Sequence, residues 1–282
     1  MKTYLVPTDF SASSVAAAHY AAALSKQTGV ARLILLHAYY VSPFEDVLPS
    51  TDFIQLAPKD IEESCRLKII ELNDIKAELR RVVNTSVEIK VQLSRLPLLR
   101  AILEVLGENA IDLLVLCSNN NPKEEETQVG RNIIEISKIS PVPVLVVPNK
   151  AVAGPLKTIV LACDFKKVTE AIPQQKLKKV WDSLNAELLV VNIDSKGLHN
   201  NQDPKMLAEE SALYEMLEPY QPQYFFIYHA DTIQGIVDFA ARHQAQMIVV
   251  LPKKYSFFQS FLYSNIAKEL TVKSSVPVLL LK

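Results

Sequence analysis

Short runs of branched apolar residues alternate along the chain with longer stretches in which apolar positions recur every three or four residues. The short runs are typical of buried strands, and the longer stretches are typical of amphipathic helices that cover them. In the first half, strands are expected near residues 3–7, 32–38, 87–93, 111–116 and 143–147, and helices near 12–28, 59–81, 97–108 and 129–139. This alternation predicts an α/β fold with a mostly parallel sheet.

The second half repeats the same order of elements. Strands are expected near residues 157–162, 186–193, 223–228, 247–251 and 277–281, and helices near 168–184, 204–218, 232–243 and 261–273. Pro173 lies inside the first of these helices, which is therefore expected to begin there, because proline is tolerated only in a first turn. Gly29 and Gly107 are placed where a left-handed residue ends a helix.

Two segments of the sequence occur twice. Residues 142–147, Val-Pro-Val-Leu-Val-Val, correspond to residues 276–281, Val-Pro-Val-Leu-Leu-Leu. An apolar run also precedes both Asp9-Phe10 and Asp164-Phe165. The offset falls from 155 residues (Asp9 to Asp164) to 134 (Pro143 to Pro277), so the second copy is shorter. Repetition on this scale indicates two tandem copies of one domain.

The expected boundaries follow from the repeat and from a polar, small-residue stretch between the copies. We expect a first domain over residues 1–148, a linker over 149–155 and a second domain over 156–282. The first copy also carries an excursion, Val41 to Pro58, that is too apolar for a simple surface loop. It is expected to pack on a neighbouring domain or on a second chain.

Composition mainly excludes classes of partner. There are 30 basic and 31 acidic residues, with a net charge of −1, which argues against a broad nucleic-acid surface. The three cysteines, Cys65, Cys117 and Cys163, have no metal-ligand spacing and are expected to be buried, reduced thiols. Asp9 interrupts the beginning of the chain before a signal-peptide core forms, and no apolar run approaches about 18 residues. A cytoplasmic, soluble protein without a membrane partner is therefore expected.

Several residues together carry a resemblance to a known family. An apolar strand that ends in Asp, an Ala-rich first helix, the pair His37-Ala38 after the second strand and a closing S-x-x-P-V-L segment occur in this order. In these features each half resembles the universal stress protein (UspA-like) family. The resemblance implies two tandem five-stranded, mostly parallel sheets flanked by helices, the adenine nucleotide alpha hydrolase-like fold. It also implies that the closing strands pair antiparallel, which would give an intramolecular pseudo-dimer, or else a homodimer.

The ATP-binding members of that family carry G-x2-G-x9-G-(S/T) between the fourth strand and the last helix. Counted back from Pro143, the first half has Cys117-x2-Asn120-x9-Gly130-Arg131, in which only Gly130 remains. Glycines let backbone N–H groups approach phosphates. This loop therefore has the length of the ATP-binding pattern but lacks most of its phosphate-binding residues.

The second half departs further, because the same count from Pro277 gives Leu251-x2-Lys254-x9-Ser264-Asn265 without any glycine. The resemblance therefore implies a ligand cleft that keeps few phosphate-binding residues. To this cleft it assigns Asp9, Ala38, Asn120, Gly130, Arg131 and Asp164.

The two aspartates allow two interpretations. A carboxylate at the carboxyl end of a strand lies where α/β sheets bind ligands, and could contact a ribose or a purine. Alternatively, each caps the following helix or holds a loop backbone, and this second interpretation is preferred. Arg131 likewise either meets a phosphate or pairs with nearby glutamates, and the pairing is preferred.

Two other features stay open in the same way. His37 is a candidate ligand contact, although a lone histidine more often has a structural role. Residues 253–261 interleave lysines with aromatics. This suits a contact with single-stranded nucleic acid or a membrane surface or, preferably, a loop folded onto the last helix. The five histidines and the serines form neither H-E-x-x-H nor G-x-S-x-G, so no catalytic site is expected.

The preferred hypothesis is a non-enzymatic stress-response protein with degenerate ATP-binding loops and no cofactor, acting through protein partners or a small ligand. The alternative is an ATP- or AMP-binding member that uses the cleft of the first domain, through Asp9, Ala38 and Gly130. An enzyme of a related adenine-binding superfamily is a third and weaker possibility.

Overall fold

The computed structural model describes residues 2–39, 58–118, 133–165, 168, 174–195, 204–251 and 269–281. The excursion predicted from Val41 onward lies outside these ranges, apart from Pro58, which begins a helix. Residues 253–261 also lie outside them. In the part of the chain that is described, no helix is both long and apolar enough to cross a membrane.

The first half contains five strands and four described helices. The strands are β1 (Lys2–Pro7), β2 (Val30–Ala38), β3 (Glu88–Ser94), β4 (Leu113–Ser118) and β5 (Val144–Pro148). The helices are α1 (Ala12–Thr28), α2 (Pro58–Arg80), α3 (Leu98–Glu108) and α5 (Ile133–Ile139). The predicted elements are confirmed within a few residues at each end.

The second half follows the same order. Its strands are β6 (Thr158–Ala162), β7 (Glu187–Asp194), β8 (Gln223–Tyr228), β9 (Met247–Val250) and β10 (Val278–Leu280). Its described helices are α7 (Gln174–Leu184), α8 (Pro204–Leu217), the short 3₁₀ helix η2 (Glu218–Tyr220) and α9 (Thr232–Arg242). Residues 269–273 are also helical.

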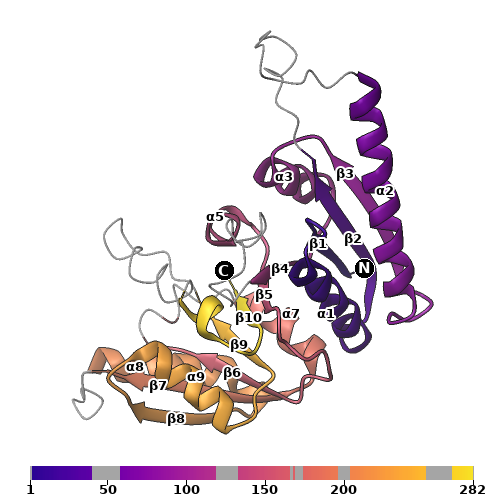
Figure 1. Cartoon of the computed structure of the whole chain (residues 1–282). Coiled ribbons are helices and arrows are strands. Elements are labelled where there is room, and N and C mark those ends of the chain that lie inside the picture. Colours follow the sequence, from indigo (N-terminus) through magenta and orange to yellow (C-terminus); the bar gives the residue numbers. More distant parts are fainter. Residues whose placement is uncertain are drawn as a thin grey trace, which may run out of the picture.

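All ten strands belong to one continuous sheet, in the order β3-β2-β1-β4-β5-β10-β9-β6-β7-β8 (Figure 1). Every neighbouring pair is parallel except β5 and β10, which are antiparallel, with Val146 opposite Val278. The α/β fold with a mostly parallel sheet is therefore confirmed. Figure 1 shows β1–β4 on one side of this pair and β6–β9 on the other.

The ends of three helices test the predictions made from glycine and proline. Gly29 ends α1 in the left-handed conformation (φ 61°), as predicted. The corresponding prediction for Gly107 is wrong, because α3 continues through it to Glu108, and the residue that follows, Asn109, is extended. The described part of α7 begins at Gln174, immediately after Pro173.

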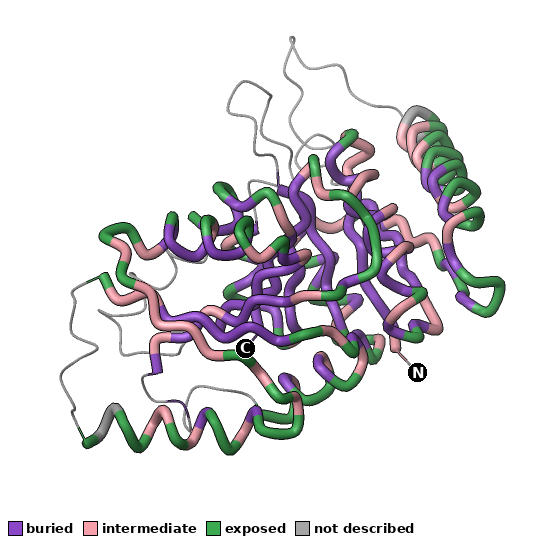
Figure 2. Tube along the Cα trace, turned by 90° about the horizontal axis from the view of Figure 1, so that it is seen from below, coloured by how far each residue is buried: buried purple, intermediate pink, exposed green. Residues whose placement is uncertain are grey.

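The core lies along the central strands. All residues of β4 and β5 are buried, and so are five of the six residues of β1 (Figure 2). Helices cover both faces of the sheet in the second half, because Tyr224 of β8 meets Tyr214 of α8 while the next residue, Phe225, meets Phe239 of α9. Strands buried on both faces need continuous apolar runs, which is the pattern seen in the sequence.

Polar contacts also join the two halves beside the antiparallel pair. The Gln27 side-chain amide at the end of α1 donates to the carbonyl oxygens of Leu156 (2.8 Å) and Leu184 (2.5 Å). Its oxygen accepts the Leu156 N–H at 2.8 Å. Lys176 of α7 donates to the Pro141 carbonyl oxygen at 2.8 Å. One glutamine thus bonds to the segment before β6 and to the end of α7.

Replacing this glutamine should weaken the junction between the halves. Gln27→Ala removes three hydrogen bonds at a half-buried position and is expected to lower the free energy of unfolding by about 1–3 kcal/mol. Urea denaturation measures the loss. The matched control is Lys26→Ala at the exposed neighbouring position, which should change stability by less than about 0.5 kcal/mol. Equal losses in the two variants would contradict this role of Gln27.

Candidate functional site

Two residues predicted to line a ligand cleft in the first half lie where β1 and β2 end side by side. Pro7 is opposite Leu36 in the parallel pair, and the Thr8 N–H donates to the Leu36 carbonyl oxygen at 2.8 Å. Asp9 therefore follows one strand end and Ala38 closes the adjacent strand. The structure brings these two predicted site residues to the same edge of the sheet.

The chain reverses after β1 in a turn formed by residues 8–10, here called the first Asp-Phe turn. Phe10 adopts a left-handed backbone conformation (φ 65°), which is uncommon for a residue with a bulky side chain. Its N–H donates to the Thr8 hydroxyl at 3.1 Å, and its ring lies 4.3 Å from the His37 ring, measured between centroids. Local hydrogen bonding and ring packing together hold this turn.

The Asp9 carboxylate is used inside the turn. One of its oxygens, Oδ1, accepts the Ser11 N–H at 3.2 Å and the Ser11 hydroxyl at 2.5 Å. Ser11 in turn is the N-cap of α1, and its hydroxyl accepts the Ser14 N–H at 3.2 Å. Asp9 thus does not cap the helix itself but positions the serine that does, which is the loop-holding interpretation of this residue.

His37 bridges the two strand ends. Its Nδ1 lies 2.8 Å from the Thr8 carbonyl oxygen, so Nδ1 carries the proton and donates to that oxygen. Burial lowers the pKa of His37 from its ordinary value of 6.5, and the Lys68 charge acts in the same direction. The bond to Thr8 and the charges of Asp9 and Glu71 oppose this lowering. The imidazole is therefore disposed to stay neutral.

Lys68 is a component of this edge that the sequence did not reveal. Its ammonium group lies 5.6 Å from the centroid of the Phe10 ring and 5.0 Å from that of Tyr39. Both distances are within the range of cation–π attraction. A lysine inside a long amphipathic helix looks like an ordinary solvated charge, and no signal in the sequence links residue 68 to residue 10.

The second half repeats this arrangement at residues 163–165, the second Asp-Phe turn. Phe165 is left-handed (φ 50°) and stacks on Phe226 with ring centroids 5.3 Å apart. The Asn192 side-chain amide donates to the Cys163 carbonyl oxygen at 2.9 Å, at the position equivalent to the bond between His37 and Thr8. The duplicated turn thus keeps one geometry while an amide replaces an imidazole.

The remaining predicted site residues divide into two groups. Asp164 lies half-buried in the second Asp-Phe turn, in the other half of the sheet from Asp9. Asn120, Gly130 and Arg131 lie outside the described residues. Within the described ranges, no group of three or more His, Cys, Asp or Glu side chains is arranged to hold a metal ion.

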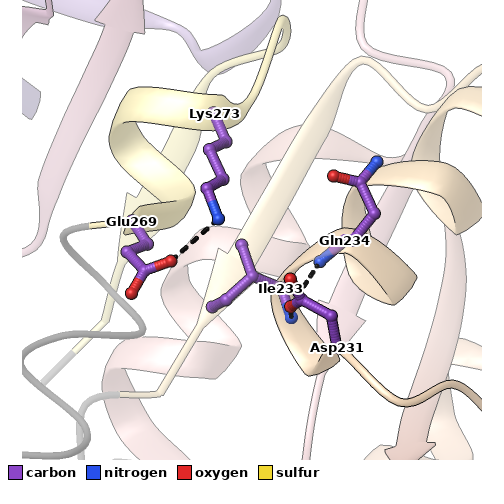
Figure 3. Close-up of polar contacts among 5 residues, drawn as sticks. All are labelled: Asp231, Ile233, Gln234, Glu269 and Lys273. Carbon is purple, nitrogen blue, oxygen red and sulfur yellow. Dashed lines mark hydrogen bonds and ion pairs between the residues drawn. The ribbon is translucent and has the colours of Figure 1, made fainter.

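A charged group in the second half has a structural explanation. The Asp231 carboxylate accepts the N–H groups of Ile233 (2.9 Å) and Gln234 (3.1 Å), and so caps α9 (Figure 3). The bond from Gln234 contributes most to the lowered pKa of Asp231. Lys273 lies nearby and pairs with Glu269 at 2.9 Å. This group stabilises a helix start at the surface and resembles no ligand site.

Comparison with known proteins identified one family and several solved structures with a similar fold. The model described as the universal stress protein family matches residues 1–148. A universal stress protein from Archaeoglobus fulgidus is similar over 99% of this chain and 96% of its own, with a TM-score of 0.67 and 16% identity. A protein of Pseudomonas aeruginosa provisionally named a universal stress protein is similar over 100% and 93%, with a TM-score of 0.63 and 17% identity.

The cytoplasmic domain of a prokaryotic cation chloride cotransporter is also similar, over 99% of this chain and 94% of its own, with a TM-score of 0.50 and 12% identity. A search of curated protein sequences gave no significant match. At these identities the structural similarities show the fold alone, while the family model concerns the half that contains Asp9, His37 and Lys68.

Exchanging the imidazole of the first half for the amide of the second tests the role of His37. His37→Asn should fold, because Asn192 makes the equivalent bond. Since the pKa of His37 is lowered on folding, its contribution to stability is present above pH 6.5 and is lost as the pH falls below that value. Urea denaturation between pH 7.5 and 5.5 should therefore show a smaller loss of stability for His37→Asn than for the wild type.

The control for this experiment is His19→Gln, which removes a histidine that is more than one-third exposed. An unchanged pH profile in His37→Asn would contradict the structural role that we assign to the buried imidazole.

Proposed function

The chain belongs to the universal stress protein family, and from that premise we propose that it is a non-enzymatic stress-response protein whose nucleotide loops are degenerate in both halves. Family and fold together make it a stress-response protein of the universal stress kind. The finer proposal concerns how it acts, which is through protein partners or a small ligand rather than through nucleotide chemistry.

The observation that supports this most directly is the use of the Asp9 carboxylate within its own turn. Its bonds to the Ser11 N–H and hydroxyl position the cap of α1, so the residue would be retained whether or not a nucleotide binds. The second half keeps the same turn, with Asp164 and a left-handed Phe165, although the loop counted back from Pro277 contains no glycine. The Asp9 carboxylate is thus explained without a ligand.

The first residues of the two segments counted back from Pro143 and Pro277 also support the loss of nucleotide binding. Cys117 is fully buried inside β4, where it is paired with Val147 of β5, and Leu251 is buried just after β9. Both positions carry apolar side chains that pack in the core, where the ATP-binding pattern has glycine. Such side chains restrict the close backbone approach that a phosphate requires.

A non-enzymatic role is supported by the partners of the histidines. His37 donates to the Thr8 carbonyl oxygen, His19 lies 3.1 Å from a Glu78 oxygen, and His229 bonds to the backbone of Asp231. His243 packs against the rings of Phe225 and Phe239. In the described part of the chain, each histidine has a structural contact that accounts for it.

We further propose that the two halves act as an intramolecular pseudo-dimer, with domains over residues 1–148 and 156–282 and a linker between them. Support comes from the antiparallel pairing of β5 with β10, which uses the strand edge that two separate chains would share. The proposed setting is the cytoplasm. The near-zero net charge favours protein partners over nucleic acid.

One alternative remains specific enough to test. The first half could hold ATP or AMP at the edge formed by Asp9 and Ala38, with Gly130 at the phosphates. Its support is that Asp9 and Ala38 do lie at adjacent strand ends, where α/β sheets bind ligands.

Titration with nucleotides separates the two functions. We expect ATP and AMP, each at about 1 mM and with or without Mg²⁺, to leave the melting temperature unchanged, since only a ligand that binds the folded state raises it. Asp9→Ala should lower stability by about 0.5–2 kcal/mol, because the Ser11 cap loses its support. Differential scanning fluorimetry and calorimetric titration measure both effects.

The matched control is Asp164→Ala in the second turn. A saturable rise in melting temperature that Asp9→Ala abolishes and Asp164→Ala preserves would replace our proposal with nucleotide binding by the first half.

A further inference from the structure

A cavity of about 540 Å³ lies between the two halves. The first half contributes Lys2 and Tyr4 of β1 and Thr28 at the end of α1, and the second half contributes residues of α7. Lys2 begins β1, whereas Asp9 follows its carboxyl end, so the cavity lies roughly 20 Å along the strand direction from the edge described above. It is therefore a different place from the sheet edge at Asp9.

The walls of the cavity are mainly apolar. Its apolar lining includes Leu24 and Leu145 of the first half and Val180 and Leu279 of the second. Tyr4 adds a hydroxyl that donates to the Thr28 hydroxyl at 2.7 Å, and burial raises the pKa of Tyr4 to about 12, so this polar group stays neutral. Volume and lining are those of a pocket for a small molecule with an apolar body, and such pockets occur preferentially between domains.

Positive charge outnumbers negative charge around this apolar space, with Lys2, Lys176 and Lys179 against Asp112 and Asp182. The ammonium groups of two lysines are anchored on the cavity wall by backbone oxygens: Lys2 by Thr28 at 2.9 Å, and Lys176 by Pro141 at 2.8 Å.

The two carboxylates have contacts of their own. Asp112 accepts the Thr3 N–H at 3.0 Å, and Asp182 accepts the Tyr220 hydroxyl at 3.1 Å. Lys179 is exposed on α7, and no hydrogen bond or ion pair to the described residues engages its ammonium group. A ligand that enters here therefore meets apolar walls and an available cation.

We propose that this cavity binds a small amphipathic carboxylate, with its apolar chain between α1, α7 and the central strands and its anionic head at Lys179. The ligand contacts both halves, so its binding stabilises their junction beside β5 and β10. This site is independent of the nucleotide question, because neither Asp9 nor Ala38 lines it.

The full-length protein offers its own reporter for a test. Trp181 is the single tryptophan of the chain, and it lies buried on α7 directly after Val180. Decanoate, titrated below its micellar range, should change the fluorescence of Trp181 in a saturable way and raise the melting temperature. Decanol, with the same chain but no charge, should bind about tenfold more weakly or worse.

Two substitutions on the same helix locate the head group. Lys179→Glu should weaken decanoate binding at least about tenfold, because it reverses the charge at the cavity. Lys178→Glu makes the same charge change at an exposed neighbouring position that does not line the cavity, and should leave the affinity within about twofold. Both side chains are exposed, so neither change should impair folding, and melting curves without ligand verify this.

The remaining outcomes overturn the proposal. These are the absence of a saturable response, equal binding of decanol and decanoate, or equal weakening by Lys178→Glu and Lys179→Glu. Val180→Phe, which fills the apolar space without changing any charge, should also reduce binding, and unchanged affinity in that variant would place decanoate elsewhere. The response to ATP is expected to be the same in all these variants. Failure of the decanoate proposal can therefore be distinguished from failure of the proposed function.

Discussion

The antiparallel pairing of β5 with β10 is the interaction on which the arrangement of the whole molecule depends. All other neighbouring strands of the sheet are parallel, and the backbone bonds between Val144–Val146 and Val278–Leu280 join the two runs into one sheet. A strand edge that is buried in this way exposes no unpaired N–H and C=O groups to other chains. The pairing also brings α1 beside α7, where Gln27 bonds to both the segment before β6 and the end of α7. The cavity between the two halves lies beside this junction.

The two Asp-Phe turns share one backbone geometry although the side chains that bond to them differ. Both turns contain a left-handed phenylalanine, and in both the residue before the aspartate accepts a bond from a side chain on the adjacent strand. The donor is an imidazole in the first half and an amide in the second, and both reach the same carbonyl position. In the first half, the Asp9 carboxylate is accounted for by its bonds to Ser11, which hold its own loop. For this reason the presence of Asp9 is weak support for nucleotide binding, and the chemistry of the phosphate loop must decide it.

Much of the fold was predictable because it depends on local periodicity. Continuous apolar runs predicted the buried strands, amphipathic stretches predicted the helices between them, and Gly29 marked the end of α1. Gly107 misled the prediction of α3, because a glycine inside a helix costs only about 1 kcal/mol, which packing of Ala101, Ile102 and Val105 in the core can offset. At the candidate site, the sequence indicated Asp9, Ala38 and His37. Ser11 stands directly before the predicted helix, where serine is a common cap, but nothing in the sequence linked Asp9 to it or placed Lys68 over the Phe10 ring.

The sequence by itself determined the family, the order of strands and helices, and which residues stand at the counted loop positions, because each of these depends on residues near one another along the chain. The tertiary structure alone decided what the retained residues do. Only when β1 and β2 lie side by side does His37 reach the Thr8 carbonyl oxygen, 29 residues away, and only the pairing of β5 with β10 places Lys2 and Lys179 around one cavity. Contacts of this kind join residues far apart in sequence, and their geometry is set by the twist and packing of the whole sheet, which no local pattern of residues records.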